Sequence, residues 1–126
     1  METLQINATK CTPSVMFNPI DHVLEIKGES YPENTSAFYE PIFEWLDSYL
    51  AQSHDNKITV NIEIIYFNSS SSKVLMDFFD ILDQAADNGK NIEVNWLYDE
   101  DNDMSLEYGE EFKEDLETLT FNLVKL

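Results

Sequence analysis

One stretch of the chain, residues 58–86, restricts the possible folds more than any other. At its start, apolar side chains occupy every second position: Ile58, Val60, Ile62, Ile64 and Tyr66. This period predicts a strand with one buried face. Ile65 and Phe67 then break the alternation. We therefore expect the end of this central strand to be covered on both faces, as in a sheet with helices packed on it.

A polar elbow, Asn68 followed by four serines at 69–72, separates this strand from an amphipathic segment. The apolar side chains of that segment recur at helical spacing: Val74, Phe78, Ile81, Leu82 and Ala85. Aspartates occupy the opposite face, which predicts a helix over residues 70–88. Hydroxyl groups at a helix start cap its free N–H groups, and the helix dipole there favours an anion. The serines are therefore helix caps in the simpler interpretation and phosphate acceptors in the other.

The charge of the chain narrows the classes of partner. Its 126 residues include 25 acidic side chains and seven lysines but no arginine, for a formal net charge of −18. Such a surface repels nucleic acid and anionic membranes, so a basic protein surface is the better partner, although acidity also serves solubility. The lone Cys11 excludes an internal disulfide. No signal peptide or long apolar run is visible, so we expect a cytoplasmic protein.

The remaining patterns predict an α/β fold. We expect a short strand at residues 4–6, a hairpin over 14–27 that ends at Gly28, a strand at 92–98 and a final strand at 119–123. Helices are predicted over 41–52, starting at Pro41 after a kinked turn, and over 105–116 with Asp103 as N-cap. A strand, a helix and a strand in succession indicate parallel pairing with a right-handed crossover. The chain should form one domain, residues 1–126, with a mixed central sheet, an N-terminal hairpin and about three helices.

Catalytic templates are missing from the sequence. It contains no GxSxG, no glycine-rich phosphate loop and no HExxH. His22 is predicted on the apolar face of a strand and His54 in an exposed loop, so neither has a predicted reason to approach the serines. We therefore expect a protein that is not an enzyme.

An acidic run invites comparison with a calcium loop. Asp99, Asp101, Asp103 and Glu110 fall at positions 1, 3, 5 and 12 of that template, but Met104 occupies position 6, where glycine makes the sharp turn. The segment before the run is predicted to be a strand, whereas the motif requires a helix. A solvated acidic loop explains the run more simply, and calcium binding stays a remote alternative. We assign no metal ligand and no cofactor.

One apolar residue of the helix over 70–88 is predicted to be exposed. At about 100° per residue, Met76 projects beside Asp80 and away from the apolar stripe. An exposed methionine near the elbow is suited to anchor a partner, although single exposed apolar residues are common.

Four ordered motifs point to a known family. They are GESYPEN at residues 28–34, YFNSSSSK at 66–73, VNWLYD at 94–99 and GEEFKED at 109–115. Together they resemble the SiaC family of bacterial regulatory phosphoproteins over roughly residues 12–115. That family is similar to STAS domains, the fold of anti-sigma factor antagonists, which agrees with the predicted order of elements.

The resemblance implies a switch without enzymatic activity. A serine/threonine kinase would phosphorylate the hydroxyl after the last asparagine of the strand, and a PP2C-type phosphatase would remove the phosphate. In the best-known branch, the unphosphorylated form binds and activates a diguanylate cyclase, which raises cyclic di-GMP and promotes biofilm behaviour. The acceptor there is a threonine, and the matching position here is Ser69, with Ser70 and Ser71 as the next candidates.

The resemblance and the helix together predict a partner surface. We expect the partner to contact Asn68, Ser69, Ser70, Lys73 and Met76. The oxygens of a phosphate on Ser69 would be held by the N–H groups of Ser71 and Ser72, so the domain itself would hardly move. An anti-sigma factor antagonist in a partner-switching system is the main alternative function.

Overall fold

The computed structural model describes all residues, 1–126. The six strands form one sheet in the order β1-β2-β3-β4-β5-β6. The first two pairings are antiparallel and the last three are parallel. The elements along the chain are β1 (Leu4–Ile6), β2 (Ser14–Asn18), β3 (Val23–Ser30), α1 (Thr35–Leu50), β4 (Ile58–Phe67), α2 (Ser69–Asp87), β5 (Ile92–Tyr98), α3 (Asp103–Glu114) and β6 (Thr120–Lys125). This arrangement confirms the predicted α/β fold with an N-terminal hairpin and a mixed sheet.

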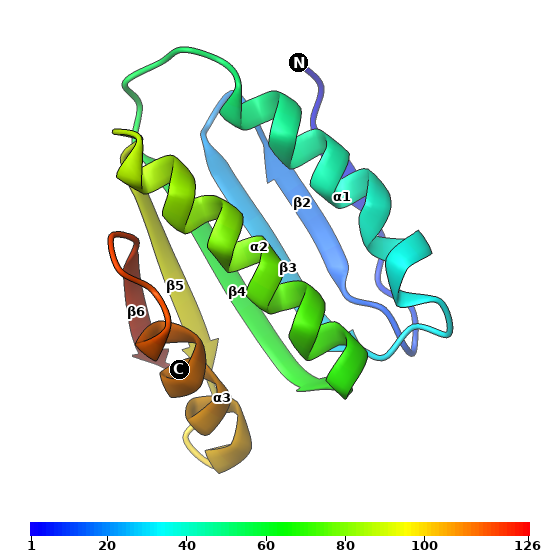
Figure 1. Ribbon diagram of the computed structural model, residues 1–126. Helices are drawn as coiled ribbons and strands as arrows, with labels where there is room; N and C mark the ends of the chain where they lie inside the picture. The colour runs from blue at the N-terminus through cyan, green and yellow to red at the C-terminus, as the bar shows by residue number, and fades with distance from the viewer.

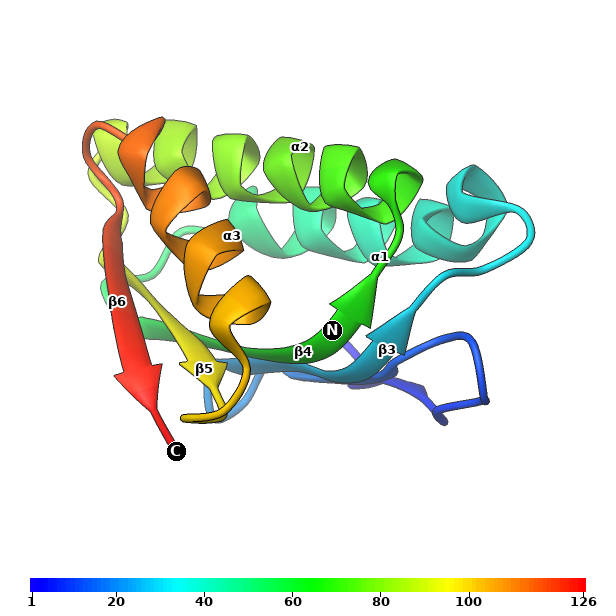
Figure 2. The same ribbon diagram turned by 90° about the horizontal axis from the view of Figure 1, so that it is seen from below.

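All three helices lie on one face of the sheet (Figure 2). The reason is topological. The parallel strands β3, β4, β5 and β6 follow one another across the sheet in sequence order. Right-handed crossovers between them therefore place every helix on the same face. The expectation that the end of β4 is covered on both faces is wrong. Ile65 is 59% exposed and Tyr66 is 51% exposed. The break in alternation there marks an uncovered apolar surface.

The hairpin differs from the prediction at its end. β3 continues past Gly28 to Ser30, and its pairing with β4 shifts register between Gly28 and Glu29. Gly28 has φ +131°, and a Cβ at this position would lie 3.3 Å from Pro13 Cα. Glycine therefore permits the irregularity instead of ending the strand.

The helices begin earlier than predicted. α1 starts at Thr35 and contains Pro41 in its interior, and α3 starts at Asp103 with Asn102, not Asp103, as N-cap. Each helix follows an asparagine whose side-chain oxygen accepts an amide hydrogen bond three residues on. The amide donors are Ala37 to Asn34 at 3.1 Å, Ser71 to Asn68 at 2.9 Å and Ser105 to Asn102 at 3.1 Å. These caps recur at an interval of 34 residues and place all three helix starts at the carboxyl edge of the parallel strands.

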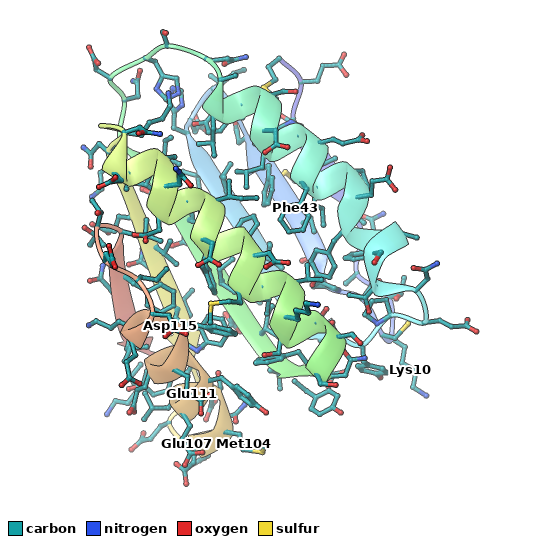
Figure 3. All side chains as sticks on the ribbon, in the orientation of Figure 1. Lys10, Phe43, Met104, Glu107, Glu111 and Asp115 are labelled. Atoms are coloured by element: carbon teal, nitrogen blue, oxygen red, sulfur yellow. The ribbon has the colours of Figure 1, made fainter.

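The core lies between the sheet and the helices. It contains 24 buried apolar residues, and Trp96, Phe79 and Phe112 pack with ring centroids 5.2 to 6.2 Å apart. Phe43 lies between α1 and α2 in Figure 3, with its ring 6.2 Å from that of Phe78. None of the three helices combines the length and the hydrophobicity of a membrane-spanning segment.

The two histidines meet at the amino edge of the sheet, far from the elbow. His22 Nδ1 lies 2.6 Å from Tyr49 Oη, and the His54 ring is 4.5 Å from that of His22. The prediction that His54 is exposed is wrong, because both of its ring nitrogens are buried. Burial, followed by the nearby His22, holds the pKa of His54 below its usual value.

One aspartate of the polar face of α2 fastens the start of β6. Asp83 accepts amide hydrogen bonds from Thr118 at 2.9 Å and from Leu119 at 2.8 Å. Burial acts to raise the pKa of Asp83, but the backbone donors outweigh it and hold the pKa below its usual value.

Candidate functional site

The elbow lies at the carboxyl edge of the sheet, where β4 runs into the start of α2 (Figure 1). The Asn68 amide donates to the carbonyl of Ser30, the last residue of β3, at 3.1 Å. The Asn68 side chain caps α2 as described above. The backbone that carries the four serines is therefore fixed by two neighbouring strands and by the helix.

The four serines differ in accessibility. Ser69 and Ser70 are exposed, Ser72 is half-buried and Ser71 is 0% exposed. The Ser71 hydroxyl lies 2.8 Å from Ser30 Oγ, which in turn lies 2.6 Å from Tyr39 Oη. Ser71 is thus part of a buried hydrogen-bond chain between α2, β3 and α1. An enzyme cannot reach it in this conformation, which corrects its place among the candidate acceptors.

Burial of this hydrogen-bond network also shifts the pKa of Tyr39. Burial raises the pKa of the Tyr39 phenol, and the hydrogen bond to Ser30 acts in the opposite direction. The phenol therefore stays neutral at physiological pH and holds the chain together. The hydrogen bonds among Ser71, Ser30 and Tyr39 hold the elbow backbone in place, and none of the three groups titrates near neutral pH.

The amides expected to hold a phosphate are already engaged. The Ser71 amide donates to the Asn68 side chain, and the Ser72 amide donates to the Asn68 carbonyl at 3.0 Å. The free donors of the first turn are the amides of Ser69 and Ser70, the first two of the helix. An anion on Ser69 would therefore meet these two amides and the positive end of the helix dipole.

A groove adjoins the exposed serines. It has a volume of about 810 Å³ and lies between the starts of α1 and α2, with Ser36, Ser70 and Lys73 among its lining residues. Lys73 is the one basic side chain in this lining. Met76 is half-buried against the core, so the prediction that it projects into solvent is wrong.

The acidic run does not form the calcium loop considered above. β5 precedes the run, and Asn102 is occupied in capping α3. Asp99 accepts a hydrogen bond from the Asp101 amide at 2.9 Å. No group of three or more His, Cys, Asp or Glu side chains is placed to hold a metal ion.

An apolar patch beside the elbow was not predicted as a site. Ile65 and Tyr66 are exposed, and the Tyr66 ring lies 5.6 Å from that of Tyr31. Met104, at the start of α3, is 61% exposed. The broken alternation at Ile65 is the sequence signal for this patch, but the pattern alone does not distinguish an exposed apolar surface from burial on both faces.

Comparison with known proteins adds a family to this geometry. A model described as SiaC family regulatory phosphoprotein matches residues 6–126. An uncharacterized protein of Pseudomonas aeruginosa strain UCBPP-PA14 is 32% identical over 115 residues, which are 91% of this chain and 90% of that protein.

Two solved structures resemble the whole chain. SiaC of P. aeruginosa matches with a TM-score of 0.92 and 29% identity, over 100% of both chains. A chain in the crystal structure of the diguanylate cyclase SiaD in complex with its activator SiaC, from the same species, also matches with a TM-score of 0.92. That chain is 30% identical, over 98% of the present chain and 99% of its own length.

Proposed function

The chain belongs to the SiaC family of regulatory phosphoproteins, and we propose that it is a phosphorylation-controlled protein-binding switch without enzymatic activity. Ser69 is the proposed acceptor, with Ser70 as the second candidate. The observation that carries the proposal is an exposed hydroxyl on the first residue of a helix that is firmly capped by Asn68. A kinase can reach this hydroxyl without unfolding the domain.

The switch would act at the surface. A phosphate adds a charge of about −1.5 to −2 and three acceptor oxygens. Two free amides are available to it, and the buried Ser71–Ser30–Tyr39 chain below holds the backbone in place. Phosphorylation therefore changes the charge and shape that a partner meets, while the fold stays the same. In the unphosphorylated form, the partner would contact Asn68, Ser69, Ser70 and Lys73, with Met76 contributing its exposed part.

The proposed output partner is a diguanylate cyclase, with a serine/threonine kinase and a PP2C-type phosphatase setting the phosphorylation state. SiaC of P. aeruginosa is described as an activator of the cyclase SiaD in complex with it. The present chain has a net charge of −18, so a complementary basic surface on the cyclase would favour binding. Activation would raise cyclic di-GMP and favour biofilm growth.

The acceptor can be identified directly. The protein is incubated with serine/threonine kinases of its own organism, and the modified residue is mapped by mass spectrometry. We expect phosphate on Ser69, its loss in Ser69→Ala and its retention in Ser71→Ala. Modification elsewhere in the chain, with an unmodified elbow, would refute the proposal.

The consequence for binding is tested with cyclases of the same organism, and with SiaD of P. aeruginosa as a second probe. We expect Ser69→Asp to weaken binding at least tenfold, because a like charge or a misplaced anion at an interface costs several kcal/mol. Ser53→Asp, which adds the same charge in the exposed loop at the opposite edge, should bind like the wild type. Equal binding by both phosphorylation states would contradict the switch. Binding to an anti-sigma factor in place of a cyclase would support the alternative output.

A further inference from the structure

β4 and β5 separate before they reach the carboxyl edge of the sheet. Their pairing runs from Ile58–Ile92 to Ile62–Trp96, and both strands continue beyond the last pair. A cavity of about 300 Å³ opens where they part, with Ile65 and Leu97 among its apolar walls. We call it the β4–β5 cavity. Its volume is at the lower end of the range for ligand sites.

Ser105 lines this cavity, and its side-chain hydroxyl is buried without a hydrogen-bond partner. Ser105 is 4% exposed, and its Oγ makes no hydrogen bond. Its backbone is satisfied, because the amide donates to Asn102 and the carbonyl accepts from Trp96 Nε1 at 2.9 Å. An unpaired buried hydroxyl costs free energy. The unpaired hydroxyl therefore indicates a place for a donor or acceptor that the chain itself does not supply.

The other lining groups define the charge of that missing group. The acidic residues Glu63, Asp99 and Asp101 are among those that line the cavity, and no lysine is. Lys27 approaches Glu63 at 3.9 Å from the neighbouring strand, and the chain has no arginine. Apolar walls with carboxylates at one site suit an alkyl chain that ends in a cation, as in lysine and arginine.

The surroundings of the cavity favour a protein as the source of this cation. Ile65 and Met104 also border a second cavity of about 50 Å³, again lined by Ser105. Figure 3 places Met104 at the outer end of α3, away from α1 and α2. A small free amine would leave this apolar border exposed to water, whereas a protein partner would bury it.

We propose that the β4–β5 cavity receives an arginine or lysine side chain of a protein partner, whose apolar surface packs over Ile65, Tyr66 and Met104. One N–H of the cation donates to Ser105 Oγ, and the carboxylates neutralise its charge. The proposal rests on the proposed function for the identity of the partner. Ser69 follows Tyr66 by three residues, so a phosphate there would stand at the border of the same contact.

The cavity itself is tested without a partner. The ¹⁵N-labelled protein is titrated with N-acetyl-arginine amide, with the uncharged N-acetyl-citrulline amide as control. We expect the arginine compound alone to shift the amide resonances of Ile65, Asn102 and Ser105. Shifts spread over all acidic surfaces, or the same shifts with calcium at lower concentration, would overturn the proposal.

Two sets of variants sharpen this test. The pair Glu63→Gln and Asp101→Asn should weaken binding of the arginine compound by about two- to fivefold per charge. Asp77→Asn and Asp80→Asn remove the same charge from α2 and should change nothing. Ser105→Ala should weaken binding without lowering the melting temperature. Equal effects of the cavity and α2 variants would reduce the binding to general electrostatic attraction and overturn the site.

The partner then separates this inference from the proposed function. We expect the cavity pair combined with Met104→Ser to weaken cyclase binding roughly tenfold, with Ser69 phosphorylation by the kinase unchanged. If phosphorylation abolishes binding but these variants bind normally, the cavity inference alone fails. If the variants weaken binding but phosphorylation does not, the proposed switch fails and the docking site stands.

Discussion

The starts of α2 and α3 consist of the same local parts. Each follows a parallel strand and an asparagine cap, Asn68 or Asn102, and each has a buried serine three residues after the cap, Ser71 or Ser105. The two serines differ in their partners. Ser71 bonds to Ser30 of the adjacent strand, whereas the Ser105 hydroxyl has no partner.

Other equivalent positions differ as well. The residue after the cap is Ser69 in α2 and Asp103 in α3, so α3 already carries a natural anion where we propose a phosphate on α2. The residue seven positions after the cap is the buried Leu75 in α2 and Gly109 in α3. The same local capping motif thus occurs at both helices. The neighbouring strand decides whether the start of the helix is hydrogen-bonded to the sheet, as in α2, or lines a cavity, as in α3.

The largest expected losses of stability come from substitutions of Leu75 and Gly109. A Cβ on Gly109 would lie 2.6 Å from Trp96 Cδ1 and 2.8 Å from Leu123 Cδ2. Gly109→Ala should therefore destabilise the protein by about 2 kcal/mol through overpacking, and Leu75→Ala by about 2–5 kcal/mol through a cavity. Urea denaturation measures both. A more stable Gly109→Ala protein would mean that helix propensity outweighs the close approach of α3 to the sheet.

The caps should differ in strength. Asn102 donates from Nδ2 to the Ile65 carbonyl at 3.0 Å in addition to its capping bond. We expect Asn102→Ala to lower the free energy of unfolding by about 2 kcal/mol and Asn68→Ala by about 1 kcal/mol. Asn102→Asp keeps the cap acceptor and serves as the control for the lost donor. Equal losses in the two alanine variants would show that the bond to Ile65 contributes nothing.

The buried serines give a matched pair with a smaller effect. Ser71→Ala removes the hydrogen bond to Ser30, which in turn bonds to Tyr39, and should lower the free energy of unfolding by about 1 kcal/mol. Ser105→Ala removes a hydroxyl that has no partner in the free protein, so its stability should change by less than about 0.5 kcal/mol. Thermal denaturation of both variants decides the comparison. Similar losses at both sites would mean that Ser105 has an internal partner after all.

The smallest effect comes from exchanging the residues after the caps. Ser69→Asp places a carboxylate in the first turn of α2 and should stabilise the protein by about 0.3–1 kcal/mol at low salt. Asp103→Ser should remove a similar contribution from α3. Both effects should shrink in about 1 M salt. A Ser69→Asp protein that unfolds more readily would show that the elbow does not tolerate an anion and would weaken the case for Ser69 as acceptor.

Much of the fold could be predicted because it depends on local patterns. The alternation in β4 and the helical spacing in α2 identify both elements within one residue of their ends. The start of α1 was missed because proline suits a first turn, yet Tyr39 upstream of Pro41 is buried and bonded to Ser30. That contact with β3 extends the helix back to Thr35, and it is invisible to a rule about neighbouring residues.

The candidate site shows the same limit. The sequence places the serines at a helix start, and four serines in a row look equivalent. Only the packed structure separates the exposed Ser69 from the buried Ser71. His54 and Met76 were both expected in solvent for the same reason, since neither loop position nor helical angle reveals which other element lies against a residue.

By itself, therefore, the sequence determined the order and type of the elements, the elbow between β4 and α2, and the family motifs. These follow from spacing and capping within a few residues. The tertiary structure decided that one face of the sheet carries no helix, which serines are accessible, and that β4 and β5 separate beside a Ser105 hydroxyl that has no partner. Those features arise from contacts between residues distant in the chain, where the packing of whole elements, and not local propensity, sets the surroundings of a side chain.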